Sequence, residues 1–135
     1  MKIIKTVFVI LKNNRGEVFL LKRDKKRDIG KWEFPGGKID EGEDGCDALR
    51  REVKEECGVS IGEVSWLDCI TKGPSVETGG DVWINNFFLC EKWTGRARVM
   101  EDLHSESKWA KLCFVDPNTL VDSAPFAKVL NWVYR

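Results

Sequence analysis

The chain has very little of several residue types on which common active sites depend. His104 is the single histidine in 135 residues, and Tyr134 is the single tyrosine. A lone histidine offers no catalytic pair, so we expect His104 to lie on the surface. No Ser or Cys stands beside an evident partner base, which argues against a covalent nucleophile.

Net charge is also absent. Twenty-two basic residues balance 22 acidic ones, so bulk electrostatics favour neither a nucleic-acid polymer nor a membrane as partner. No apolar run approaches the length of a membrane span, and Met1-Lys2 leads into a strand-like segment rather than a signal peptide. We therefore expect a single cytoplasmic domain over residues 1–135, as a monomer or homodimer.

Five cysteines are present, an odd number, and no two of them form a Cys-x-x-Cys pair. Cys46 and Cys57 fall on the apolar side of an expected helix, and Cys90 ends an apolar strand. We expect buried thiols rather than disulfides or zinc ligands.

An acidic helix is the most informative feature that the chain does have. Glu52, Glu55 and Glu56 stand at positions i, i+3 and i+4, which places them on one helical face. Three neighbouring carboxylates repel one another, so a solvated acidic face has to be weighed against a metal site. Clustered carboxylate oxygens are the ligands that Mg²⁺ and Mn²⁺ prefer.

The boundaries of this helix can also be predicted. Asp44 is a suitable N-cap, and Gly58 follows the last turn, where a left-handed residue is favoured. Upstream, Pro35-Gly36-Gly37 is expected to form a tight turn whose backbone can approach other groups closely. An apolar stripe, rotated away from the three glutamates, is expected to bury the helix on a sheet: Cys46, Leu49, Val53 and Cys57.

Residues 37–59 resemble the Nudix box, G-x5-E-x7-R-E-U-x-E-E-x-G-U with U apolar. Every fixed and apolar position agrees: Gly37, Glu43, Arg51, Glu52, Val53, Glu55, Glu56, Gly58 and Val59. The preceding Trp32–Pro35 run is similar to the approach to the box in MutT-type members. The resemblance implies an α/β/α sandwich, Mg²⁺ (with Mn²⁺ as a substitute) and hydrolysis of phosphoanhydride bonds in nucleotides.

The resemblance also implies roles for particular residues. Glu52 and Glu56 are expected to be metal ligands, with Glu55 as a third that is also catalytic and the Gly36 carbonyl as a further ligand. Arg51 is expected to pair with Glu43 or another box carboxylate. In the family, a glutamate from a later loop often supplies a metal ligand or the general base. Glu101 is the first candidate for this role and Glu106 its rival, and for each of them a solvated loop acid stays open as the alternative.

Substrate contacts are expected from residues around the box. Arg23 and Lys38 are the candidates for binding phosphate, whereas the rest of the basic 22–31 loop is expected to be solvated. Phe34 is a candidate for stacking on the base, with three alternatives left open: Trp32, Trp83 and Phe87.

The order of elements agrees with a mixed sheet covered on both faces, an α+β fold. Strands are predicted over 3–11, 18–21, 32–34, 64–70, 82–93 and 109–115. Besides the box helix, Asp116-Pro117 is a helix-start signal, and apolar residues at helical spacing over 126–134 predict a C-terminal helix. This helix is expected to cover the second face of the sheet.

For the substrate, hydrolysis of a (d)NTP to (d)NMP and pyrophosphate is the first expectation. Pro74 lies 15 residues beyond Val59, a spacing associated with hydrolysis of ADP-ribose, so that activity stays open. A non-catalytic nucleotide-sensing domain is the third reading, although such domains typically lose box acids. The Asn that reads an oxidised purine in MutT-type chains has no clear equivalent in 122–125.

Overall fold

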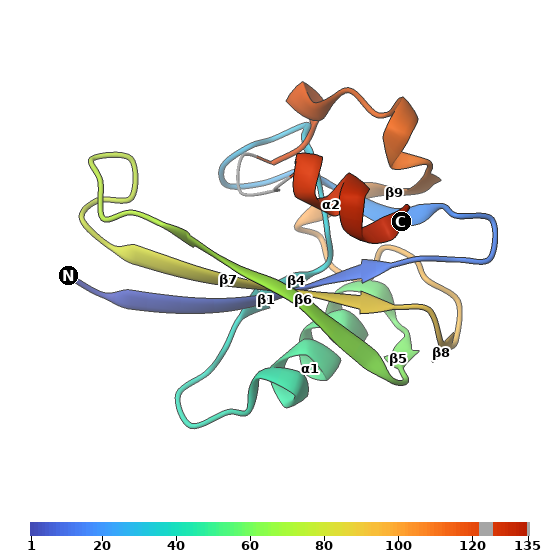
Figure 1. The fold of residues 1–135 in the computed structure, drawn as a ribbon, viewed down its shortest axis with the longest axis horizontal. Coiled ribbons are helices and arrows are strands. Elements are labelled where there is room, and N and C mark those ends of the chain that lie inside the picture. Colours follow the sequence, from blue (N-terminus) through green and yellow to red (C-terminus); the bar gives the residue numbers. More distant parts are fainter. Residues whose placement is uncertain (122–125, 135) are drawn as a thin grey trace.

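The computed structural model describes residues 1–121 and 126–134 (Figure 1). Helix α1 spans Gly45–Cys57 and helix α2 spans Phe126–Val133. The strands are β1 (Ile3–Leu11), β2 (Val18–Arg23), β3 (Trp32–Glu33), β4 (Gly36–Lys38), β5 (Ser60–Ile61), β6 (Val64–Lys72), β7 (Val82–Cys90), β8 (Trp93–Thr94) and β9 (His104–Ala110). Two short 3₁₀ helices, η1 (Leu112–Phe114) and η2 (Pro117–Thr119), follow β9.

Strand β1 is at the centre of a four-stranded mixed sheet with the order β4-β1-β7-β6. It pairs in parallel with β7, from Ile3 opposite Val82 to Leu11 opposite Cys90, and antiparallel with β4. A second sheet has the order β3-β2-β9, and β5 pairs with β8.

Alternation along β1 builds two cores, one on each face of the sheet. Val7 and Val9 point into a core with Leu49 and Val53 of α1. The neighbouring Ile10 instead joins a second core with Phe87, Val129 and Val133, the last two from α2. Figure 1 shows the helices on opposite sides of the sheet, which confirms the predicted α/β/α sandwich.

Helix α1 has the predicted caps. The Asp44 carboxylate accepts hydrogen bonds from the backbone N–H groups of Cys46 and Asp47, and Gly58 has a φ of 74°. Leu49, Val53 and Cys57 are fully buried, as the stripe predicts.

The prediction of buried thiols is wrong for two residues. Cys46 is exposed in the first turn of α1 and Cys113 is exposed on η1, whereas Cys69 is half-buried. All five cysteines lie in the described residues and are free thiols.

Two strand predictions and one turn prediction need correction. Strand β7 ends at Cys90, and Trp93 begins the separate strand β8. Strand β9 occupies 104–110 rather than 109–115, because its polar residues pair with β2 and its apolar end turns into η1. Gly36-Gly37 is not a turn but part of β4, which pairs with β1.

In the part of the chain that the structure describes, no helix is both long and apolar enough to cross a membrane.

Candidate metal and nucleotide site

Strand β4 and helix α1 meet where a side chain on the strand would overlap a carboxylate on the helix. A Cβ atom at Gly37 would lie 2.5 Å from Cδ of Glu52. The absence of a side chain at Gly37 thus lets the Glu52 carboxylate lie directly against the strand. The backbone of Gly36 and Gly37 approaches other groups closely, as the sequence predicts. The two glycines, however, lie in a strand and not in a turn.

The acids of α1 line a cavity of about 410 Å³ next to this contact. Glu52, Glu55 and Glu56 meet Glu101, from the segment between β8 and β9, on its wall. The cavity is completed by the following residues: Thr6, Phe8, Arg23, Lys26, Arg27, Glu33, Gly36, Gly37, Lys38, Trp83, Leu103 and Val121.

Glu56 is buried, with only 4% of its surface exposed. Its Oε1 accepts a hydrogen bond of 2.8 Å from the backbone N–H of Gly36. Burial raises its pKa well above the ordinary value, and the charges of Glu33, Glu52 and Glu101 act in the same direction. The pKa of Glu52 is raised for the same main reason, burial, although the neighbouring Arg51 opposes this.

Arg51 joins three box positions. Its Nε and NH2 donate to the two oxygens of Glu43, both at 2.9 Å, and its NH1 donates to Glu52 Oε1 at 2.9 Å. NH1 also lies 3.5 Å from a carboxylate oxygen of Glu55. The hydrogen bond from Arg51 is the main cause that lowers the pKa of Glu43 to about 2. Arg51 therefore orients carboxylates, in the pairing that the sequence predicts.

The donor set fits a divalent cation. Glu52, Glu55 and Glu56 offer hard oxygen ligands beside the Gly36 backbone, and Gly37 leaves the space that the Glu52 carboxylate needs. Burial is the main cause of the raised pKa of Glu56, and the charges of Glu33, Glu52 and Glu101 add to it. A bound cation would compensate those charges.

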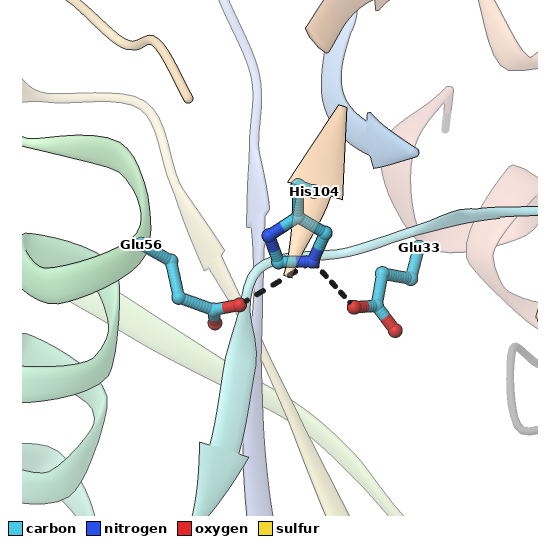
Figure 2. A group of neighbouring side chains, drawn as sticks. All are labelled: Glu33, Glu56 and His104. Atoms are coloured by element: carbon cyan, nitrogen blue, oxygen red, sulfur yellow. Dashed lines mark hydrogen bonds and ion pairs between the residues drawn. The ribbon is translucent and has the colours of Figure 1, made fainter. Parts of the chain in front are cut away.

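His104 is not a surface residue, and that prediction is wrong. Only 3% of it is exposed, because β9 pairs with β2 and turns the ring inward between the sheet and α1. Figure 2 shows its Nε2 between two carboxylates, 2.8 Å from Glu33 Oε1 and 3.6 Å from Glu56 Oε2. The candidate ligand atoms of these three residues lie within 4.8 Å of one another.

The structure separates the two later glutamates. Glu101 lines the cavity with the box acids. Glu106 lies on β9, where its carboxylate pairs with Lys22 at 3.1 Å, and it is not among the residues that line the cavity.

The expected substrate contacts are only partly brought together. Lys38 and Arg23 line the cavity. However, Arg23 donates through NH1 to both oxygens of Glu33 and through Nε to the Arg27 carbonyl. Phe34 is only 3% exposed and belongs to the core that α2 covers, so the prediction that it stacks on a base is wrong.

Lys26 and Arg27 of the basic loop, which were expected to be solvated, also line this cavity. Trp83, one of the alternatives to Phe34, lines this cavity and a neighbouring one of about 310 Å³. Arg27 lies over its ring at 5.2 Å and Lys38 at 5.6 Å. Asn85, two residues further along β7, accepts a 2.6 Å hydrogen bond from Thr6 Oγ1. The period of two in β7 is the signal that places Trp83 and Asn85 on one face.

The neighbouring cavity joins aromatic and polar groups. Phe8, Trp83 and Val121 line both cavities together with Arg27, so the two are adjacent. Segment 122–125, in which no purine-reading Asn was found, lies outside the described residues.

Comparisons with known proteins agree with this geometry. A model of the NUDIX domain matches residues 2–132. The 8-oxo-dGDP phosphatase NUDT18 of Mus musculus is 34% identical over 101 residues, which are 75% of this chain and 29% of that protein. The 8-oxo-dGTP diphosphatase of Buchnera aphidicola subsp. Schizaphis graminum is 35% identical over 92 residues, 65% of this chain and 62% of that protein.

The fold has close structural neighbours as well. The crystal structure of a MutT NUDIX hydrolase from Burkholderia pseudomallei superposes with a TM-score of 0.83 and 25% identity, covering 96% of this chain and 98% of that one. This chain belongs to the Nudix family. It spans less than a third of the length of the NUDT18 proteins that it matches.

Proposed function

We propose that this chain is a divalent-metal-dependent pyrophosphohydrolase that converts a (d)NTP into a (d)NMP and pyrophosphate. The observation that carries the proposal is the convergence of Glu52, Glu55, Glu56 and Glu101 on one cavity that also contains Lys38. Glu52 and Glu56 are the proposed metal ligands, with Glu55 and the Gly36 carbonyl completing the protein's share. Mg²⁺ is the proposed ion and Mn²⁺ its substitute.

When bound, the cation would neutralise phosphate charge and acidify an attacking water. The protein's own groups supply position and proton transfer. Arg51 holds Glu43 and Glu52 in place, and Lys38 would bind a phosphate oxygen. Glu101 is the proposed acceptor of the proton from water, because it faces the cavity and Glu106 does not.

The attack is proposed to occur at phosphorus by water. Among the described residues lining the main cavity there is no Ser, Cys or His, and the Thr6 hydroxyl is held by Asn85. No covalent enzyme intermediate is therefore proposed.

Trp83 is proposed to stack on the nucleobase. Its ring lines both the acidic cavity and the adjacent one, which has room for a base. The names of the relatives, an 8-oxo-dGDP phosphatase and an 8-oxo-dGTP diphosphatase, support a purine nucleotide in this place. Nucleoside diphosphates are the second candidate substrates, since several NUDT18 proteins bear the name 8-oxo-dGDP phosphatase.

One nucleotide panel tests the proposal. It contains normal and 8-oxo dNTPs and dNDPs together with ADP-ribose, each with Mg²⁺ and with chelator, and the products are identified by chromatography. We expect the monophosphate and pyrophosphate from a triphosphate, with ¹⁸O from labelled water in one phosphorylated product. Orthophosphate as the primary product of a triphosphate would overturn the proposal and indicate a phosphatase.

A further inference from the structure

A continuous line of polar side chains connects the 22–31 loop with the box helix. Arg23 NH1 donates to both oxygens of Glu33, at 3.0 and 3.1 Å. Glu33 Oε1 lies 2.8 Å from His104 Nε2, which is in turn 3.6 Å from Glu56 Oε2 (Figure 2). Three strands, β2, β3 and β9, thus contribute to the surroundings of one carboxylate on α1.

These groups are shielded from water. The side chain of His104 is fully buried, and those of Glu33 and Glu56 are 13% and 6% exposed. Two carboxylates placed so close together in a dry environment repel each other strongly. A hydrogen-bond donor between them is the group that the arrangement requires.

His104 is that donor. A nitrogen 2.8 Å from a carboxylate oxygen carries the hydrogen, because two lone pairs at that distance would repel. The other ring nitrogen, Nδ1, is buried and has no hydrogen-bond partner among the described residues. Among the described residues, the polar contacts of the ring are therefore those of Nε2.

The same geometry argues against a second cation between these three residues. With its hydrogen on Nε2, the imidazole has no lone pair to offer there. Glu33 already accepts from the guanidinium of Arg23 through both oxygens. The positive charge in this place is that of Arg23.

Glu56 thus has a neighbour at each oxygen of its carboxylate. The Gly36 N–H donates to Oε1 at 2.8 Å, and Nε2 of the His104 ring lies 3.6 Å from Oε2. We propose that His104 is a positioning residue that keeps Glu56 oriented for metal binding and links it to Arg23 through Glu33. This inference rests on the proposed function, in which Glu56 is a metal ligand.

Replacement of His104 tests the inference by metal binding in the absence of substrate. Mn²⁺ affinity is measured by electron paramagnetic resonance in wild type, His104→Leu, His104→Gln and His104→Asn. A Gln amide reaches the place of Nε2, whereas an Asn amide reaches only that of Nδ1. Ser105→Ala is the matched control, because Ser105 is the next residue of β9 and is exposed.

We expect His104→Leu and His104→Asn to bind Mn²⁺ about 10- to 100-fold more weakly, the range typical of groups that orient metal ligands. His104→Gln should stay within about threefold of wild type, as should Ser105→Ala. Thermal melts in chelator establish that each variant is folded, and the comparison of Gln with Asn remains decisive if Leu is unstable.

The outcomes separate the two proposals. Equal Mn²⁺ affinity in wild type, His104→Leu and His104→Asn would overturn the positioning role, even if nucleotides are hydrolysed. A loss of affinity that depends on His104 in a protein that hydrolyses no nucleotide would overturn only the proposed function. A wild-type protein without Mn²⁺ affinity would overturn both.

Discussion

The carboxylate of Glu52 occupies the space that a side chain at Gly37 would fill. The distance of 2.5 Å between a Cβ at residue 37 and Glu52 Cδ is shorter than any normal contact. Both groups belong to rigid elements, a paired strand and a capped helix. The glycine of the box is therefore a packing requirement of the acid that follows it 15 positions later.

Gly37→Ala should displace Glu52 and weaken metal binding. We expect the Mg²⁺ concentration for half-maximal turnover to rise at least about tenfold, because ligands lose affinity when their orientation is disturbed. Gly45→Ala is the control: a Cβ there has only ordinary contacts at 3.9 and 4.0 Å, and the change should stabilise the fold by roughly 0.4–1 kcal/mol. Equal Mg²⁺ dependence in the two variants would contradict this account of Gly37.

Glu56→Gln should make the metal-free protein more stable at high pH. The pKa of Glu56 is raised on folding, so ionisation is resisted more in the folded than in the unfolded chain. The free energy of unfolding of wild type should therefore fall as the pH rises above the unfolded pKa, about 4.5, towards the folded one. A Gln at position 56 is neutral, so the variant does not lose stability in this way as the pH rises. Its amide oxygen can still accept a hydrogen bond from the Gly36 N–H.

Urea unfolding in chelator measures the effect. The advantage of Glu56→Gln should be greatest near pH 8 and should vanish below about pH 4. The same variant should lose orders of magnitude in turnover with Mg²⁺. A variant less stable than wild type at pH 8 would be evidence against electrostatic strain at Glu56.

Mg²⁺ should raise the melting temperature of the wild-type protein. A ligand that binds only the native state stabilises it by about 2.7 kcal/mol at a hundred times its Kd. Glu52→Gln combined with Glu56→Gln should abolish the shift, since the two proposed ligands are then neutral. Differential scanning calorimetry with and without the ion measures both. An unchanged shift in the double variant would locate the ion elsewhere.

Glu101→Gln and Glu106→Gln should differ strongly. Glu101 faces the box acids, and we expect its replacement to lower kcat by about 100-fold or more, the range for a positioned acid or base. Glu106 forms only an exposed pair with Lys22, so its replacement should stay within about twofold. Steady-state kinetics in saturating Mg²⁺ checks both, and a larger loss for Glu106→Gln would reverse the assignment.

Trp83→Ala should raise the KM for nucleotides. Stacking of a base on an aromatic ring contributes about 1–3 kcal/mol, which corresponds to a roughly 5- to 150-fold loss in kcat/KM. Trp66→Ala is the control, because Trp66 is 58% exposed on β6 and lines neither of the two cavities around Trp83. Measurement with inorganic or abasic polyphosphates should show no difference between the variants. A Trp83→Ala protein with unchanged KM would show that the base binds elsewhere.

The features that were predictable from sequence are those set by local geometry. Helical spacing determines that Glu52, Glu55 and Glu56 share one face, and Asp44 and Gly58 mark the helix ends through hydrogen bonds within a few residues. The pairing of Arg51 with Glu43 follows from the box itself. These contacts span at most one helix and the loop before it.

The environment of Glu56 was not predictable in this way. His104 meets Glu33 only because β2 pairs with both β3 and β9, which joins positions 71 residues apart. Nothing in the immediate sequence of either residue specifies that register. Phe34 was misjudged for a related reason: a two-residue strand has too little alternation to show which face is buried.

The parallel pairing of β1 with β7 determines when the site can exist during folding. Thr6 and Asn85, which form part of the floor of the cavities, come from positions 79 residues apart. Contacts between such distant segments carry a high loop-closure entropy and form late in slow-folding topologies. A nascent chain that ends after Cys57 already contains every acid of the box, yet it lacks β7, which pairs with β1, and the later segments that bring Glu101 and His104 to the box acids. Metal capture is therefore a property of the completed fold, and the motif acquires it only when the distant strand arrives.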